Sequence, residues 1–297
     1  MPDFLATMAT GSRERVRSAR SAIPERELRA RIRNLPAPAP LQTSLEGFDL
    51  ITEVKRVSPS EGRLDGASVV KRARAYAEAG AAAISVLTEP EAFGGSLEDL
   101  ESISRNVSTG VDSIPTMRKD FLTDPYQLLE ARASGAGGAL LVLRLLPDDR
   151  IAEMLDAAEE TGLFLLLEAF DEEEIERAGA VAARAEGGGV EALVGLNCRD
   201  LKSLAVDFGR LEKLADHFPA GTRRVAESGV RSAEDAARVA ASRYDLALVG
   251  TELMRHEDPG PVVARMLAAG RSARTLTRIG RLDAASAIDL ASSAQAP

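Results

Sequence analysis

One pattern constrains this chain more than any other: from Phe48 onward, short apolar runs that end in polar residues alternate with segments of helical periodicity. Eight runs are predicted strands: Asp49–Val54, Ala82–Leu87, Ser113–Met117, Ala139–Val142, Phe164–Leu167, Ala192–Leu196, Arg224–Ala226 and Leu246–Val249. Apolar strands that alternate with helices favour a parallel sheet covered on its outer side. Eight such units predict an α/β protein with a (β/α)₈ TIM barrel. No Gly-x-Gly-x-x-Gly follows the first strand, which disfavours a dinucleotide-binding sheet.

The segments on either side of this pattern are predicted to form separate parts. Residues 1–47 are predicted to be an N-terminal helical extension with one or two amphipathic helices, ended by the proline-rich run Pro36–Pro40 because proline lacks a backbone donor. Residues 48–269 are predicted to be the catalytic barrel. Residues 270–297 are rich in Ala, Ser and Arg and do not follow the pattern. We expect a peripheral helix or disorder there.

Composition excludes several classes of function. The net charge of −9 disfavours nucleic acid and anionic membranes as partners, because their phosphate groups repel a field of that sign. Cys198 is the only cysteine and there are two histidines, so neither a disulfide nor a thiolate or histidine metal site is expected. No apolar run is long enough to span a membrane. We expect a cytoplasmic protein whose anionic small-molecule substrate is bound in a local basic pocket.

Charged residues accumulate where the predicted strands end, which is where the active site of such a barrel forms. Glu53 and Lys55 close the first strand, and strand alternation places them on the same side. They form either an acid/base pair or a solvated salt bridge. Later strands end in further polar residues: Lys119 in the third, Glu168 in the fifth, Asn197 and Arg199 in the sixth, and Glu227 and Ser228 in the seventh. Five of eight strands ending this way favours a common site over chance.

The loops after the last two predicted strands are suited to phosphate. They contain Ser228-Gly229 and Gly250-Thr251. Barrels of this class commonly bind phosphate at this place, because glycine lets the backbone approach the anion and a hydroxyl adds a donor. The alternative is two ordinary tight turns.

With these residues in place, the sequence resembles indole-3-glycerol phosphate synthase, from the N-terminal helix to about Leu267. The resemblance is carried by six stretches in the family's order: Ile51–Gly62, Ser85–Ser96, Arg118–Phe121, Gly195–Leu201, Ala226–Gly229 and Val249–Met254. It implies a carboxy-lyase of tryptophan biosynthesis. The implied reaction closes the ring of 1-(2-carboxyphenylamino)-1-deoxyribulose 5-phosphate and then removes carbon dioxide and water. Association with other enzymes of that pathway stays open.

The resemblance also implies roles for individual residues. Lys119 is implied as the general acid on the ketone oxygen, Glu168 as a carboxylate near the cationic intermediate, and Lys55 with Glu53 as the groups for dehydration and positioning. The remaining implied catalytic residues are Asn197, Glu227 and Ser228. The implied phosphate and substrate contacts are Ser58, Phe93, Phe121, Arg199, Gly229, Gly250 and Thr251.

The chemistry of this reaction explains the residue types. Protonating a ketone needs an acid, and a lysine packed among apolar groups and other cations is expected to have its pKa lowered toward working pH. The iminium formed by ring closure accepts the electrons released on decarboxylation. We therefore expect neither a metal nor an organic cofactor.

Two other functions are compatible with the same residues. Cys198, Ala169-Phe170, Val57 and Thr251 depart from the family's usual pattern, which leaves open a paralogue acting on another phosphosugar, including a Schiff-base aldolase. A borohydride-stable adduct on Lys55 or Lys119 would identify the aldolase. A catalytically silent phosphosugar-binding subunit is the third hypothesis, and the complete set of acidic and basic residues disfavours it.

Overall fold

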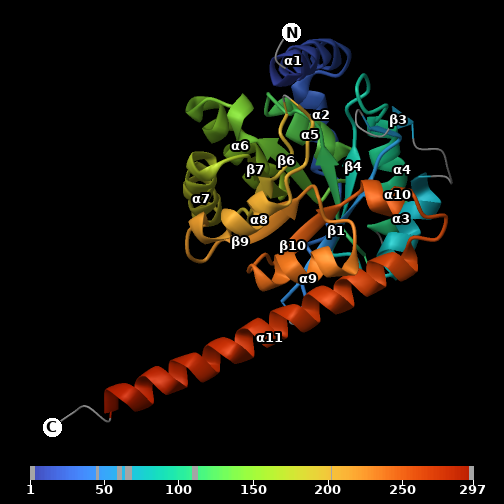
Figure 1. Cartoon of the computed structure of the whole chain (residues 1–297). Coiled ribbons are helices and arrows are strands. Elements are labelled where there is room, and N and C mark those ends of the chain that lie inside the picture. The colour runs from blue at the N-terminus through green and yellow to red at the C-terminus, as the bar shows by residue number, and fades with distance from the viewer. Residues whose placement is uncertain are drawn as a thin grey trace.

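Eight parallel strands close into a barrel in the computed structural model, which describes residues 4–44, 47–58, 62–63, 69–108, 113–201 and 203–293. The order around the barrel is β1-β10-β9-β8-β7-β6-β5-β4 (Figure 1). The strands are β1 (Asp49–Val54), β4 (Ala83–Leu87), β5 (Thr116–Lys119), β6 (Gly138–Val142), β7 (Phe164–Ala169), β8 (Ala192–Asn197), β9 (Arg223–Glu227) and β10 (Leu246–Val249). The predicted TIM barrel is confirmed.

Helices surround the barrel: α3 (Val69–Glu78), α4 (Leu97–Val107), α5 (Tyr126–Ala133), α6 (Asp148–Thr161), α7 (Glu172–Gly187), α8 (Gly209–Lys213), α9 (Ala233–Ala241), α10 (Thr251–Met254) and α11 (Gly260–Ser293). The chain also forms two 3₁₀ turns, Leu143–Leu145 and Ala215–His217. A small antiparallel hairpin consists of β2 (Val57–Ser58) and β3 (Gly62–Arg63). Side chains of Ser96, Asp171 and Ser232 cap α4, α7 and α9.

Strand boundaries differ from the prediction in ways that matter for the site. The third barrel strand, β5, begins at Thr116 and ends at Lys119, whereas the sequence predicted Ser113–Met117. Pro115 explains the late start, because it has no backbone donor for the ladder. The seventh strand, β9, also extends further than predicted and ends at Glu227. The side chains of Lys119 and Glu227 are therefore held by strand backbone rather than carried on loops.

Four charged side chains occupy one level of the barrel interior because alternate strands supply each interior layer of such a barrel. They are Glu53 of β1, Lys119 of β5, Glu168 of β7 and Glu227 of β9. The residue two positions earlier in each of these strands is apolar and buried, and together these residues fill the layer beneath: Ile51, Met117, Leu166 and Val225. The charged layer therefore lies on an apolar floor, at the C-terminal ends of the strands.

The N-terminal extension forms α1 (Phe4–Ala22) and α2 (Glu25–Ile32), and α1 lies across the C-terminal end of the barrel (Figure 1). Its attachment is polar as well as apolar. Arg15 Nη2 donates to Asp120 Oδ1 at 2.8 Å, and its Nη1 lies 3.6 Å from the buried Glu89 carboxylate. The buried Ser12 hydroxyl lies 3.3 Å from Thr123 Oγ1. These contacts join α1 to the loops that follow β4 and β5.

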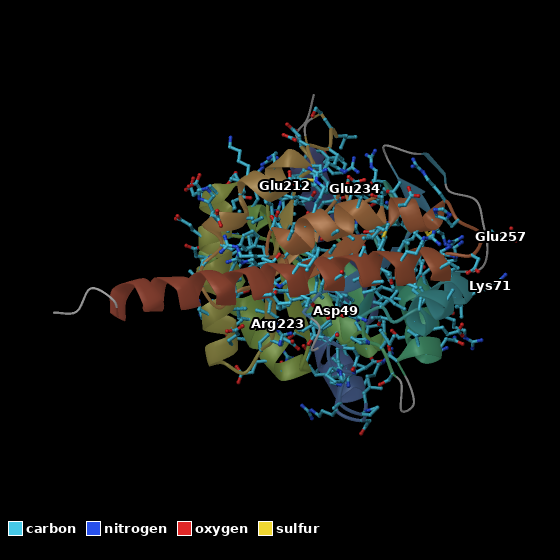
Figure 2. All side chains as sticks on the ribbon, turned by 60° about the horizontal axis from the view of Figure 1, so that its bottom comes forward. Asp49, Lys71, Glu212, Arg223, Glu234 and Glu257 are labelled. Atoms are coloured by element: carbon cyan, nitrogen blue, oxygen red, sulfur yellow. The ribbon has the colours of Figure 1, made fainter. Side chains whose placement is uncertain are left out.

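The last helix lies at the opposite end of the barrel. Arg271 of α11 donates to Asp49, the first residue of β1, at 2.8 Å, and Arg274 donates to Asp245 at 2.6 Å. Figure 2 shows Asp49 beside α11. The helix continues from Gly260 through Gly270 to Ser293. Within the described part of the chain, none of the helices combines the length and apolarity that crossing a membrane requires.

We predict that Arg15→Leu lowers the free energy of unfolding by about 1–3 kcal/mol, because it leaves the buried Asp120 and Glu89 without this cation. Arg17→Leu is the matched control, since Arg17 is 75% exposed and its nearest carboxylate is 3.9 Å away. Urea denaturation of the two variants measures the difference. Equal stability of both variants would show that Arg15 does not hold α1 on the barrel.

Candidate functional site

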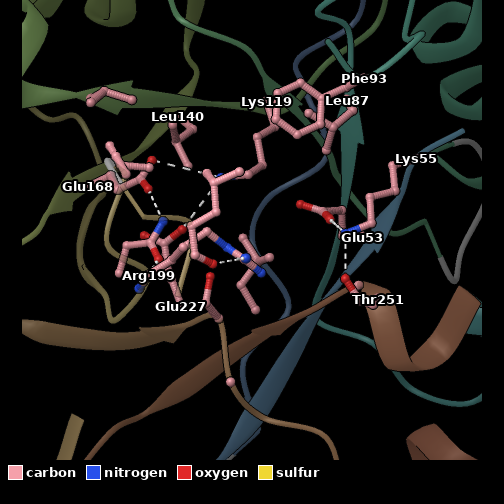
Figure 3. A pocket seen from close by; sticks show the side chains of 18 of the residues that line it. Glu53, Lys55, Leu87, Phe93, Lys119, Leu140, Glu168, Arg199, Glu227 and Thr251 are labelled. Atoms are coloured by element: carbon pink, nitrogen blue, oxygen red, sulfur yellow. Dashed lines mark hydrogen bonds and ion pairs between the residues drawn. The ribbon is translucent and has the colours of Figure 1, made fainter. Parts of the chain in front are cut away.

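A cavity opens at the C-terminal ends of the strands (Figure 3). Phe4 of α1 belongs to its lining. Its charged and polar lining consists of Glu53, Lys55, Lys119, Asp120, Glu168, Asn197, Arg199, Glu227, Ser228, Arg231, Thr251, Glu252 and Arg255. Its apolar lining includes Phe4, Leu87, Phe93, Phe121, Leu140, Val142, Phe170, Leu201 and Leu248. Charged groups at the centre and apolar groups around them suit a substrate with both ionic and aromatic parts.

Lys119 is at the centre of one group of charges. Its Nζ lies 3.6 Å from Glu227 Oε2 and 3.8 Å from Glu168 Oε2 (Figure 3). Asn197 Nδ2 donates to the other Glu168 oxygen at 2.5 Å, which fixes that carboxylate. Glu168 and Glu227 are buried, whereas the Lys119 side chain keeps 18% of its surface exposed toward the cavity. Lys119 is therefore the most exposed side chain of this cluster.

The protonation of this cluster is set by burial and mutual charge. Burial raises the pKa of Glu227 to about 8, the nearby Glu168 adds to the rise, and Lys119 opposes it. Burial lowers the pKa of Lys119, but Glu168, Glu227 and Glu53 outweigh it, so its net pKa lies above the ordinary value. The expectation of a lowered lysine pKa is therefore wrong, because carboxylates rather than other cations surround the amine. Lys119 is charged at neutral pH, and Glu227 can carry a proton there.

Lys55 belongs to a second group of charges across the cavity (Figure 3). Its Nζ donates to Thr251 Oγ1 at 2.7 Å and lies 3.1 Å from Glu53 Oε1. Thr251 is the first residue of α10, directly after β10. Lys55 thus links the end of β1 to the loop that was predicted to bind phosphate. Glu53 and Lys55 form a buried ion pair rather than a solvated salt bridge.

The loop after β9 has an unusual backbone. Ser228 has φ +67° and Gly229 has φ +83°, so two successive residues adopt the left-handed conformation. A non-glycine residue with positive φ is uncommon and is often associated with a functional site. A Cβ on Gly229 would lie 3.2 Å from Cys198 Sγ, so the turn also needs glycine for space. Ser228 and Gly229 both line the cavity, so this turn forms part of the cavity wall.

Three aromatic rings from separate parts of the chain form one wall of the cavity. Phe121 packs edge-on against Phe4 of α1 at 5.8 Å and lies 6.3 Å from Phe93. The buried Glu89 carboxylate orders the loop that carries Phe93, because it accepts hydrogen bonds from the backbone amides of Glu91, Ala92 and Phe93. This wall is suited to an aromatic ring of a substrate.

All but one of the predicted site residues line this single cavity. The exception is Ser58, whose backbone belongs to β2 but whose side chain lies outside the described part of the structure. Sequence reasoning missed Phe4, Phe170 and Leu87. Alternation from Glu168 could have identified Phe170, two residues further along. Phe4 carried no such signal, because it reaches the site from a separate helix.

Among the described residues, no group of His, Cys, Asp and Glu side chains is suited to hold a metal ion.

Comparison with known proteins agrees with this geometry. The family model described as "Indole-3-glycerol phosphate synthase" matches residues 5–266. A protein of that name from Micrococcus luteus is 39% identical over 278 residues, covering 91% of this chain and 99% of the relative. Another from Streptomyces griseus is 43% identical over 226 residues, covering 76% of this chain and 79% of the relative.

Solved structures with low sequence identity show the fold alone. A 3-hexulose-6-phosphate synthase superposes with a TM-score of 0.56 at 16% identity, covering 74% of this chain and 99% of that one. Thiamine phosphate pyrophosphorylase from Pyrococcus furiosus gives a TM-score of 0.53 at 18% identity, covering 77% and 99%. Both comparisons concern the barrel.

We predict that Glu227→Gln becomes more stable relative to the wild-type protein as pH rises from 5 to 8. A carboxyl whose pKa is raised on folding binds more protons in the folded state, so its burial destabilises the protein increasingly as pH rises toward 8. The stability difference between variant and wild type should change by at least about 1 kcal/mol over this range. Urea denaturation at several pH values measures it. A difference that does not depend on pH would contradict the raised pKa of Glu227.

Proposed function

The chain belongs to the indole-3-glycerol phosphate synthase family, and we propose that Lys119, held beside Glu168 and Glu227, starts the family's reaction. The function is that of this carboxy-lyase family of tryptophan biosynthesis. Its substrate, 1-(2-carboxyphenylamino)-1-deoxyribulose 5-phosphate, undergoes ring closure, decarboxylation and dehydration to indole-3-glycerol phosphate, carbon dioxide and water. The observation that supports these residue roles is the ammonium group of Lys119, 3.6 and 3.8 Å from two buried carboxylates, on a side chain that lines the cavity.

In the proposed first step Lys119 donates a proton to the ketone oxygen while the aryl carbon attacks the carbonyl carbon. The raised pKa of Lys119 keeps the proton on the amine at neutral pH, and it also makes this ammonium group a weaker acid than an ordinary lysine. Ring closure gives an iminium cation, which the fixed Glu168 carboxylate stabilises from its position beside Asn197. Loss of carbon dioxide then returns electrons to this cation. Glu227 holds or accepts a proton during these steps, since its pKa is about 8.

Lys55 and Glu53 are proposed to act in the dehydration. Loss of the hydroxyl group as water needs a proton donor at the oxygen and a base for the proton removed from the ring. The two groups lie 3.1 Å apart on the opposite side of the cavity from Lys119. Two separate acid/base groups allow ring closure and dehydration to proceed without moving the substrate between sites.

Substrate binding is assigned to the surrounding loops. We place the phosphate at Gly229, Gly250 and Thr251, with Arg199 and Ser58 as further contacts, and the aryl ring against Phe93 and Phe121. Asn197 and Ser228 contact hydroxyls or the anthranilate part. Residues 48–269 are proposed as the catalytic unit, 1–47 as its cover and 270–297 as a peripheral tail. A cytoplasmic location and association with other tryptophan-pathway enzymes belong to the same proposal.

We predict that Lys119→Ala lowers kcat by at least about 10³-fold while the substrate still binds, because the proposed phosphate contacts lie on other loops. Indole fluorescence during incubation with the carboxyphenylamino ribulose phosphate measures turnover, and calorimetry measures binding. Near-normal turnover in Lys119→Ala would refute the role of this lysine.

We predict that Thr251→Val raises KM about tenfold and changes kcat less, since a phosphate contact stabilises ground state and transition state alike. Thr251→Ser is the matched control, because it keeps the hydroxyl group and should behave like the wild type. A loss confined to kcat would instead indicate that Thr251 acts mainly through Lys55, which donates to it at 2.7 Å.

A further inference from the structure

Gly195 lies in the middle of β8, where its missing side chain leaves the space that the Glu227 carboxylate occupies. A Cβ placed on Gly195 would overlap Glu227 Oε1 and would lie 3.0 Å from Glu227 Cδ. The φ angle of Gly195 is not positive, so the strand backbone does not itself require glycine. What this position requires is space. On its other side the same Cβ would lie 3.1 Å from Leu166 Cδ1, so no free room remains.

Packing rather than hydrogen bonding determines where Glu227 lies. Within the described part of the chain, neither carboxylate oxygen of Glu227 accepts a hydrogen bond, and Lys119 Nζ at 3.6 Å is just beyond hydrogen-bond distance. Glu168, in contrast, is fixed by Asn197. A carboxylate without a directional partner takes its position from the atoms around it. Gly195 therefore leaves the space that the Glu227 carboxylate fills, while Lys119 pairs with that carboxylate at 3.6 Å.

The strand itself cannot yield to an added methyl group. Gly195 is paired with Glu168 of β7 on one side and with Val225 of β9 on the other, so ladder hydrogen bonds hold its backbone from both directions. The carboxylate of Glu227 must move instead, and any movement changes its position relative to Lys119. The same arrangement recurs at Gly250, where an added Cβ would overlap Glu53 Oε1 and lie 2.9 Å from Glu53 Cβ.

We propose that Gly195 is a positioning residue for catalysis, which acts by leaving the space in which Glu227 is held beside Lys119. This inference rests on the proposed function, in which Lys119 and Glu227 carry out the proton transfers. It assigns a role to a residue that is not part of the cavity lining and that acts through the space it leaves for Glu227.

Gly195→Ala is expected to lower kcat by at least about tenfold and to change KM by less than about threefold, because the binding loops are untouched. Gly138→Ala is the matched control. Gly138 is also a strand glycine, and its added Cβ would overlap the Phe164 ring rather than a charged group. Gly138→Ala should lower thermal stability yet leave the kcat of folded enzyme unchanged. Wild-type kcat in Gly195→Ala, or an equal loss in both variants, would overturn the proposal.

A double-mutant cycle with Glu227→Asp tests the contact itself. The shorter aspartate withdraws its carboxylate from the space above residue 195, so the loss in Gly195→Ala/Glu227→Asp should be smaller than the product of the two single losses. Multiplicative losses would contradict the contact. If Gly195→Ala does not fold, Gly195→Ala/Glu227→Ala should restore folding by removing the overlapping group, and a double variant that also fails to fold overturns the proposal.

Activity measurements on single variants separate the failure of this inference from the failure of the proposed function. Full activity in Lys119→Ala would end the proposed function. Lost activity in Lys119→Ala and Glu227→Gln, together with wild-type kinetics in Gly195→Ala, would end only the inference about Gly195.

Discussion

Three carboxylates and one ammonium group share the upper interior of this barrel, and the rest of the site depends on how they balance. A buried carboxylate is unfavourable unless a cation pairs with it or a proton neutralises it. Lys119 is close to two carboxylates, Glu168 and Glu227, so one positive charge cannot neutralise both. The raised pKa of Glu227 resolves this, because a protonated Glu227 leaves Lys119 and Glu168 as a neutral pair. Lys55 pairs with the third carboxylate, Glu53, so these side chains together carry no net charge and admit an anionic substrate more easily than a negatively charged cluster would.

The barrel creates this cluster by geometry rather than by local sequence. Alternate strands supply one interior layer, so residues separated by 49 to 66 positions in the chain reach the same level. The apolar layer beneath excludes water from below, and α1 covers part of the opening above. Gly195 on β8 and Gly250, which follows β10, leave room for the carboxylates. The charged layer therefore requires small residues as much as it requires the charged ones.

Much of this could be predicted from the sequence, because strand alternation and strand-end polarity are local signals. The barrel, the strand-end charges and the glycine turns after β9 and β10 follow from them. The direction of the pKa shift of Lys119 could not be predicted, because it depends on distances to Glu53, Glu168 and Glu227 on three other strands. Arg15 and its partner Asp120 are 105 residues apart, and nothing in either segment indicates the other. The space at Gly195 depends on strand register, which the sequence pattern leaves undetermined.

The central claim is that Glu227 is buried beside Lys119 and carries a proton near neutrality. NMR of protein labelled with ¹³C at the glutamate carboxyl carbon tests it most directly. The structure predicts one carboxyl resonance that titrates with a pKa near 8 and is missing from Glu227→Gln. If every glutamate resonance titrates below about pH 6, as ordinary carboxyl groups do, Glu227 is ionised throughout the working range and the charge balance described for this site is wrong.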